Sequence, residues 1–96
     1  MKIKTPKVAK ELEAISRRAL GECFSEAGKH ELAKEEHDRY LILAKQLNDP
    51  VEVQRAHATI GRTYLLWSND SGNSVDKDLL FKSAASFKRA LDLCQQ

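Results

Sequence analysis

The sequence contains few of the residues that interrupt regular secondary structure. Among its 96 residues there are only four glycines and two prolines, and aromatic residues make up 6%. An all-β fold needs a turn about every 8–12 residues, and turns depend heavily on glycine and proline. The composition therefore argues against an all-β fold and favours a small number of long helices.

Long apolar runs are also missing. No stretch approaches the ~18 apolar residues of a membrane-spanning helix, and the opening MKIKTPKVAKEL lacks the apolar centre of a signal peptide. Cys23 and Cys94 are far apart in the sequence. We expect both to be reduced thiols that pack on helical stripes as small apolar side chains. These absences favour a protein of the cytosol or nucleus that does not contact membranes.

Neither sign of charge dominates the sequence. Sixteen basic and fourteen acidic residues leave a net charge of +2, and the start is basic, with Lys2, Lys4, Lys7 and Lys10. A strong nucleic-acid binder usually has a larger basic excess, or a basic stripe interleaved with aromatic residues. We interpret the lysines as a solvated terminus and expect no direct binding of nucleic acid.

Motifs for catalysis and cofactor binding are absent. There is no GxxxxGK or GxGxxG phosphate loop and no GxSxG nucleophile motif. His30 and His37 are seven positions apart, about 10 Å along a helix, which is too far for one metal ion. We expect no metal, no cofactor, no catalytic residue and no enzyme activity. His30 is expected to be exposed, and His37 and His57 to lie on or beside packing stripes.

Four segments have small and apolar residues at spacings of three and four, the pattern of amphipathic helices. The first helix is predicted from Pro6, with Thr5 as its N-cap, to Gly28, because glycine suits a helix C-terminus. The second helix is predicted to begin near His30. The stripes expected to form the core are Leu12, Ile15, Ala19, Leu20, Phe24 and Ala27; Ala33, His37, Tyr40, Ala44 and Leu47; Val53, His57, Ile60, Tyr64 and Trp67; and Leu80, Ala84, Phe87, Leu91 and Cys94.

The run Asn48, Asp49 and Pro50 ends the second helix and begins the third. Asp49 is the expected N-cap, Pro50 fits the first helical position, and Glu52 at the third position gives a variant of the capping box. The third helix is predicted to end in a polar cluster after Trp67. We expect Trp67 to pack in the core against the fourth helix, or else to form an exposed apolar patch for a partner.

Two of the helices share a short pattern. ALGECF at 19–24 and TIGRTY at 59–64 place Gly21 and Gly61 at equivalent positions, 40 residues apart. A glycine inside a helix costs about 1 kcal/mol relative to alanine, so each is expected to admit a close neighbour, Ala33 and Ser83 respectively. These pairs are 12 and 22 positions apart, so the second hairpin carries an insertion of about ten residues.

This pattern resembles the tetratricopeptide repeat, with L-G-x-x-Y followed by A-x-x-x-F-x-x-A, although the period here is 40 rather than 34. The resemblance implies an all-α fold of two antiparallel helix hairpins stacked as tetratricopeptide-like repeats, a fragment of an α-solenoid. We predict a single domain over residues 1–96. Repeat one covers about 6–47, and repeat two about 50–94, with the inserted polar loop at about 68–77.

A narrower resemblance rests on QRAHATIGRTYL at 54–65, on the spacing of His37, Tyr40 and Leu47, and on ASFKRAL at 85–91. These segments are similar to the N-terminal repeat region of the Tonsoku-like family. The resemblance implies a scaffold in the nucleus that acts at damaged replication forks and in homologous recombination. In that family ankyrin repeats read newly made histone H4, and a C-terminal part holds the obligate partner. The chain is expected to be a fragment of such a protein or a short divergent homologue.

Two alternatives remain within the repeat class: an adaptor of the kind that binds G-protein and polarity regulators, and a purely structural repeat segment. A third, from another class, is an enzyme or ligand-binding helical bundle, which a buried polar cavity joining His37 and His57 would favour. Phe81, Leu91 and Cys94 are expected to be open to a following repeat. We expect this end either to self-associate or to leave the fold marginally stable.

In tetratricopeptide arrays the first helix of each hairpin lines a concave groove that binds a protein or peptide. The resemblance places this groove on Ile15, Arg18, Glu22, Ser25 and Glu26, and on Arg55, Ala58, Arg62, Leu65 and Leu66. Arg18, Arg55 and Arg62 are expected to grip an acidic side chain or a C-terminal carboxylate through forked hydrogen bonds. The alternative is that these arginines solvate a helix face and pair with Glu22 or Glu26.

Overall fold

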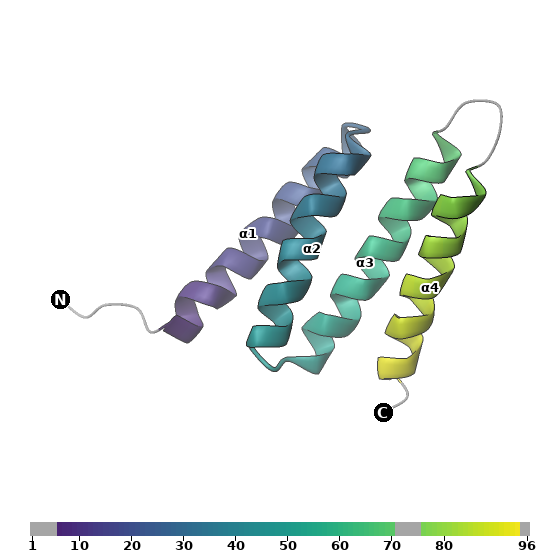
Figure 1. Cartoon of the computed structure of the whole chain (residues 1–96). Helices are drawn as coiled ribbons and strands as arrows, with labels where there is room; N and C mark the ends of the chain where they lie inside the picture. The colour runs from purple at the N-terminus through teal and green to yellow at the C-terminus, as the bar shows by residue number, and fades with distance from the viewer. Residues whose placement is uncertain (1–5, 71–75, 95–96) are drawn as a thin grey trace.

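A computed structural model describes residues 6–70 and 76–94. They form four helices, α1 (Pro6–Glu26), α2 (His30–Gln46), α3 (Pro50–Asn69) and α4 (Lys77–Cys94), with no strand in the described part (Figure 1). This confirms the all-α class. The predicted cap at Thr5 and most of the polar loop lie outside the described residues.

The turn between α1 and α2 depends on Gly28, which has a φ of 77°. Its N–H donates to the Ser25 carbonyl at 3.0 Å, and the Lys29 N–H donates to the Phe24 carbonyl at 2.8 Å. This pair of bonds is the Schellman motif, which satisfies carbonyls left open at a helix C-terminus. Gly28 therefore ends α1 as predicted.

The turn between α2 and α3 has the same length, three residues. Asn48 takes the left-handed conformation, with a φ of 53°. The Asp49 N–H donates to the Ala44 carbonyl at 3.3 Å, and the Asp49 carboxylate accepts from the Glu52 N–H at 3.2 Å. Asp49 thus closes α2 with its backbone and caps α3 with its side chain, and Pro50 is the first residue of α3.

The end of α3 is connected to the start of α4 by hydrogen bonds of Ser68 and Asp76. α3 continues past Trp67 to Asn69. The Ser68 hydroxyl is buried and donates to the Asp76 carbonyl at 3.2 Å. The Asp76 carboxylate accepts from the N–H groups of Asp78 and Leu79, which caps the start of α4.

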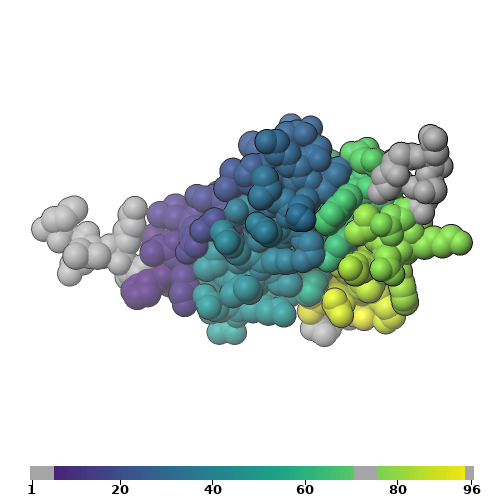
Figure 2. Space-filling view, turned by 45° about the horizontal axis from the view of Figure 1, so that its top comes forward, coloured from purple at the N-terminus to yellow at the C-terminus, as the bar shows by residue number. Residues whose placement is uncertain are grey.

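The helices pack in chain order: α1 on α2, α2 on α3, and α3 on α4. α1 and α4 therefore lie at opposite ends of the assembly (Figures 1 and 2). α2 has a neighbour on both sides, and four residues of its predicted stripe, Ala33, His37, Tyr40 and Ala44, are buried. The fifth, Leu47, follows the helix and is only partly buried. Two antiparallel hairpins are thus stacked as the repeat pattern predicts.

The predicted stripe on α1 is wrong. Leu12, Ile15 and Leu20 are exposed, Ile15 by 55%, and the buried residues are Ala14 and Gly21. The apolar residues of α1 lie on two faces of the helix, and α2 covers only the face that carries Ala14 and Gly21. The reading of the cysteines as packed apolar side chains is also wrong, because the end helices leave Cys23 and Cys94 exposed.

The predicted stripe on α4 is wrong by one position. The buried residues are Leu79, Ser83, Ser86 and Ala90, whereas Leu91 is 56% exposed. The second helices of the two repeats align with an offset of 50, so Leu91 is the counterpart of Leu41, and Ala84 of Lys34. In α2 this face meets α3. In α4 it meets no helix of the described chain.

The end of α4 is open, as the sequence predicts. Phe81 is 72% exposed, and Leu91 and Cys94 are exposed with it. α4 therefore presents an apolar face where a further repeat would pack.

Each mid-helix glycine lies under an aromatic ring. A Cβ at Gly21 would lie 2.5 Å from His37 Cε1, and a Cβ at Gly61 would lie 3.1 Å from Phe87. His37 and Phe87 are counterparts at the offset of 50. The Ser83 hydroxyl also donates to the Gly61 carbonyl at 2.7 Å, which confirms the predicted contact in repeat two. In repeat one the ring of His37 lies closest to Gly21, not Ala33.

Candidate functional site

The carboxylate of Glu52 is the meeting point of three helices. It pairs with Arg18 of α1 at 3.7 Å and with Arg55 of α3 at 3.3 Å, and it accepts a hydrogen bond from the Tyr40 hydroxyl of α2. Although Asp49 caps the Glu52 N–H, the Glu52 side chain does not complete the capping box. It is used instead for these tertiary contacts.

Around this carboxylate lies a groove of about 270 Å³, here called the arginine groove. It runs between α1 and α3 and over the turn that joins α2 to α3. Its lining combines two arginines, three carboxylates and three apolar side chains: Arg18, Arg55, Glu11, Asp49, Glu52, Ala14, Ile15 and Leu47.

Tyr40 forms the base of this arrangement. Its side chain is almost fully buried, and the Arg18 guanidinium lies 5.8 Å from the centre of its ring. Burial raises the pKa of Tyr40 to about 12, and the hydrogen bond to Glu52 acts in the same direction. The neutral phenol is therefore the form that the folded chain stabilises.

This pKa predicts a loss of stability in alkali. The unfolded chain releases the Tyr40 proton near its ordinary pKa of 10, whereas the folded chain holds the proton until about 12. The stabilisation is therefore complete below pH 10 and is lost as the pH rises towards 12. Tyrosinate absorbance should show one of the two tyrosines titrating late, and Tyr40→Phe should remove that phase. Late titration that persists in Tyr40→Phe would contradict this assignment.

The arginine groove contains only part of the predicted set. Arg18 and Arg55 come together there, but they pair with Glu52 rather than with Glu22 or Glu26. Arg62 and Glu22 lie instead near His37, whose pKa their charges influence. The predicted positions Glu22, Ser25, Arg62 and Leu65 are not among the groove's lining residues.

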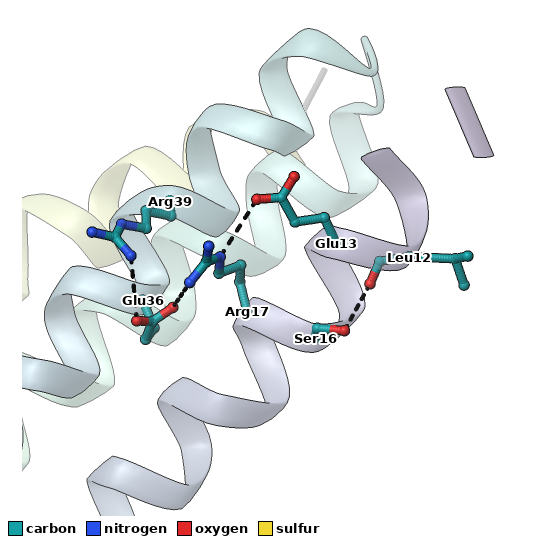
Figure 3. Close-up of polar contacts among 6 residues, drawn as sticks. All are labelled: Leu12, Glu13, Ser16, Arg17, Glu36 and Arg39. Atoms are coloured by element: carbon teal, nitrogen blue, oxygen red, sulfur yellow. Dashed lines mark hydrogen bonds and ion pairs between the residues drawn. The ribbon is translucent and has the colours of Figure 1, made fainter. Parts of the chain in front are cut away.

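A second charged cluster was not foreseen from the sequence (Figure 3). The buried carboxylate of Glu36 lies between Arg17 of α1, at 2.9 Å, and Arg39 of its own helix, at 3.7 Å. Glu13 pairs with the other side of Arg17 at 3.5 Å. The hydrogen bond that Arg17 donates to the Glu36 carboxylate raises the pKa of Arg17, so the guanidinium stays charged. The sequence signal for this cluster is the spacing of four between Glu13 and Arg17 and of three between Glu36 and Arg39, which suits ion pairs on a helix.

Comparison with known proteins shows similarity over most of the chain. This chain is 38% identical to a Tonsoku-like protein of Drosophila melanogaster, and the match covers 88% of this chain. It is 32% and 34% identical to those of Mus musculus and Bos taurus, over 86% in each case. The chain is homologous to one segment of the Tonsoku-like proteins. This confirms the narrower resemblance expected from residues 54–65.

The homology covers a small part of each relative. The chain spans about 6% of the length of these Tonsoku-like proteins. No protein-family model matches the chain, and no solved structure matches it. None of the described helices is long and apolar enough to cross a bilayer.

His30 is buried, so the expectation that it is exposed was wrong. Its Nε2 lies 2.6 Å from the Asp70 carboxylate, and its ring stacks on Trp67 with centroids 6.2 Å apart. Trp67 therefore packs against α2, whereas the sequence predicted packing against α4. The start of α2 is thereby fixed to the end of α3.

The other two histidines are buried, as predicted, and burial lowers the pKa of each. His37 lies over Gly21, whereas His57 lines a groove on another face that His37 does not line. The arrangement thus gives no support to a cavity shared by the two. Residues 6–70 and 76–94 contain no group of three metal-binding side chains. The expectation that the chain is not an enzyme stays a prediction.

Proposed function

We propose that the chain is a protein-interaction module whose arginine groove binds a short segment of a partner protein. In this proposal it serves a nuclear scaffold of replication-coupled DNA repair and homologous recombination. The homology to Tonsoku-like proteins supports the setting. The meeting of Arg18 and Arg55, from two different helices, beside an apolar strip carries the proposal of a binding groove.

The groove has the chemistry for a peptide with a carboxylate next to an apolar residue. Each guanidinium has five N–H donors in a planar fork, and Glu52 occupies only part of them. Arg18 and Arg55 are partly exposed, so the remaining donors can reach a ligand carboxylate. Ala14, Ile15 and Leu47 offer apolar surface to the neighbouring residue.

Arg55→Glu should weaken partner capture by about tenfold or more, because it places a second carboxylate beside Glu52 and repels an acidic ligand. The matched control is Arg39→Glu. Arg39 also pairs with a glutamate three positions earlier, at 3.7 Å, but it lies outside the groove. The measurement is affinity capture from nuclear extract, with captured proteins quantified by mass spectrometry.

The proposal expects a set of replication-fork proteins that Arg39→Glu retains and Arg55→Glu loses. Arg55→Gln, which removes the charge without adding a repulsive one, should lose the same set if the guanidinium makes the contact. Equal capture by all three variants would exclude the arginine groove as the binding site.

The exposed apolar face of α4 favours a second, structural role. We propose that a following repeat, or a second copy of the chain, packs on the face that carries Phe81 and Leu91. In α2 the counterpart of Leu91, Leu41, is partly buried and lies with His57 and Ile60 of α3. A chain in this role would be a spacer that maintains the geometry of a longer array.

A further inference from the structure

A second groove lies on another face of the molecule, between α2 and α4, with α3 as its floor. It has a volume of about 320 Å³ and is here called the cationic groove. Its apolar floor is formed by Leu41 and Ile60, and one end is formed by His57, Ser86 and Arg89. The arginine groove shares none of these residues.

Comparison of the two repeats shows that the end formed by His57, Ser86 and Arg89 has no counterpart of the Glu36 carboxylate. Arg17 and His57 are counterparts at the offset of 40, and Glu36 and Ser86 are counterparts at the offset of 50. Arg39 and Arg89 are likewise 50 positions apart. Repeat one thus holds a carboxylate between two basic groups, and repeat two has a serine where that carboxylate would stand.

In repeat two the corresponding basic residues, His57 and Arg89, therefore line the groove with a serine, not a carboxylate, at the equivalent position. Lys45 and Arg89 lie close enough to His57 to lower its pKa, in addition to the effect of its burial. The only carboxylate that lines the cationic groove is Asp38, and it pairs with Lys34. These two cations disfavour the protonated form of His57, and an anion bound beside it would act in the opposite direction.

The other end of the groove is also cationic. The ammonium groups of Lys34 and Lys82 each lie 6.0 Å from the centre of the Tyr64 ring. Tyr64 follows His57 by seven positions on α3, so the two ends are about 10 Å apart. An extended peptide covers this distance in three residues.

We propose that the cationic groove binds an acidic peptide of a protein partner, with one carboxylate between His57 and Arg89 in the place that Glu36 occupies in repeat one. A second carboxylate, about three residues along, lies near Lys82 and Tyr64. An apolar residue between them rests on Leu41 and Ile60. This surface is additional to the arginine groove and does not depend on it.

The observations favour a peptide over nucleic acid. The vacant position corresponds to a side-chain carboxylate, and the two cationic ends are separated by an apolar floor. Single-stranded nucleic acids are bound by a continuous basic track with several stacking aromatic residues. Tyr64 is the one aromatic ring, histidine aside, that lines this groove.

The test uses fluorescein-labelled peptides in which a leucine lies between two glutamates placed two, three or four positions apart, followed by fluorescence anisotropy. Peptides with glutamine in place of glutamate, and a single-stranded DNA oligonucleotide, are the reference ligands. The spacing of three should bind most tightly. Ser86→Glu supplies the missing carboxylate from within the chain and should weaken peptide binding by about tenfold or more. Ser86→Gln has the same size without the charge and should retain most of the binding.

A second readout separates occupation of the site from misfolding. The imidazole of His57, followed by NMR, should titrate at a higher pH in Ser86→Glu than in Ser86→Gln, and at a higher pH with the acidic peptide bound to the wild type. Arg55→Glu should leave the peptide-induced shift of the His57 imidazole unchanged, because that signal reports the cationic groove and His57 does not line the arginine groove. Failure of this proposal is thereby distinct from failure of the arginine groove. The proposal is overturned if no spacing binds, if both Ser86 variants bind as the wild type does, or if the oligonucleotide competes for the groove more strongly than the peptides.

Discussion

Gly21→Ala is expected to lower the free energy of unfolding by about 1–2 kcal/mol, although alanine is the better helix former. The new methyl group would lie 2.5 Å from the ring of His37, which is only 1% exposed and cannot move aside. Overpacking of this kind typically costs about 1–3 kcal/mol, and here it must exceed the gain of about 1 kcal/mol in helix propensity.

The matched substitution is Gly61→Ala, which should change the free energy of unfolding by less than about 1 kcal/mol. Its methyl group would lie 3.1 Å from Phe87, and that ring is 39% exposed and free to shift outward. Urea unfolding of both variants, followed by circular dichroism, measures the difference. Equal effects at the two glycines would show that the burial of the facing ring does not decide the outcome.

Glu36→Ala is expected to lower the free energy of unfolding by about 2–3 kcal/mol. The substitution leaves Arg17 and Arg39 next to each other without their shared, buried counter-charge. Glu36 is the buried member of the cluster, and its loss removes the carboxylate on which two partly exposed arginines converge together with the packing of its side chain.

Glu13→Ala is the control for that substitution. Glu13 contacts the same arginine at 3.5 Å but is half exposed, so its loss should cost less than about 0.5 kcal/mol. Thermal or urea unfolding of the two variants at low and moderate salt measures both. A Glu36→Ala variant as stable as Glu13→Ala would show that solvent compensates the arginines and that the cluster has little structural weight.

The helices and turns could be predicted from sequence because their causes are local. Gly28 and Asn48 act within one turn of chain, and Asp49 caps the N–H group three residues ahead. The core faces of α1 and α4 could not be predicted in the same way. Spacing identifies apolar residues such as Leu12 and Leu91, but burial depends on which helix lies alongside.

In the candidate site, too, the features with local causes could be predicted and those that depend on helix packing could not. The register of the glycines placed Arg18 and Arg55 on the first helices of the two repeats, and the structure brings them together. Glu52, which pairs with both arginines, was predicted from the sequence to cap the start of its own helix, α3. Its use by Tyr40 depends on the packing of α2 against α3, which no local pattern encodes. The Glu36 cluster was missed because it too crosses between helices.

The double role of Asp49 bears on how the chain transmits motion. Hinges need a few residues that can change their backbone angles without breaking other contacts. Between α2 and α3 there is no such residue, because the one that closes the first helix also caps the second. The two hairpins should therefore turn as one lever.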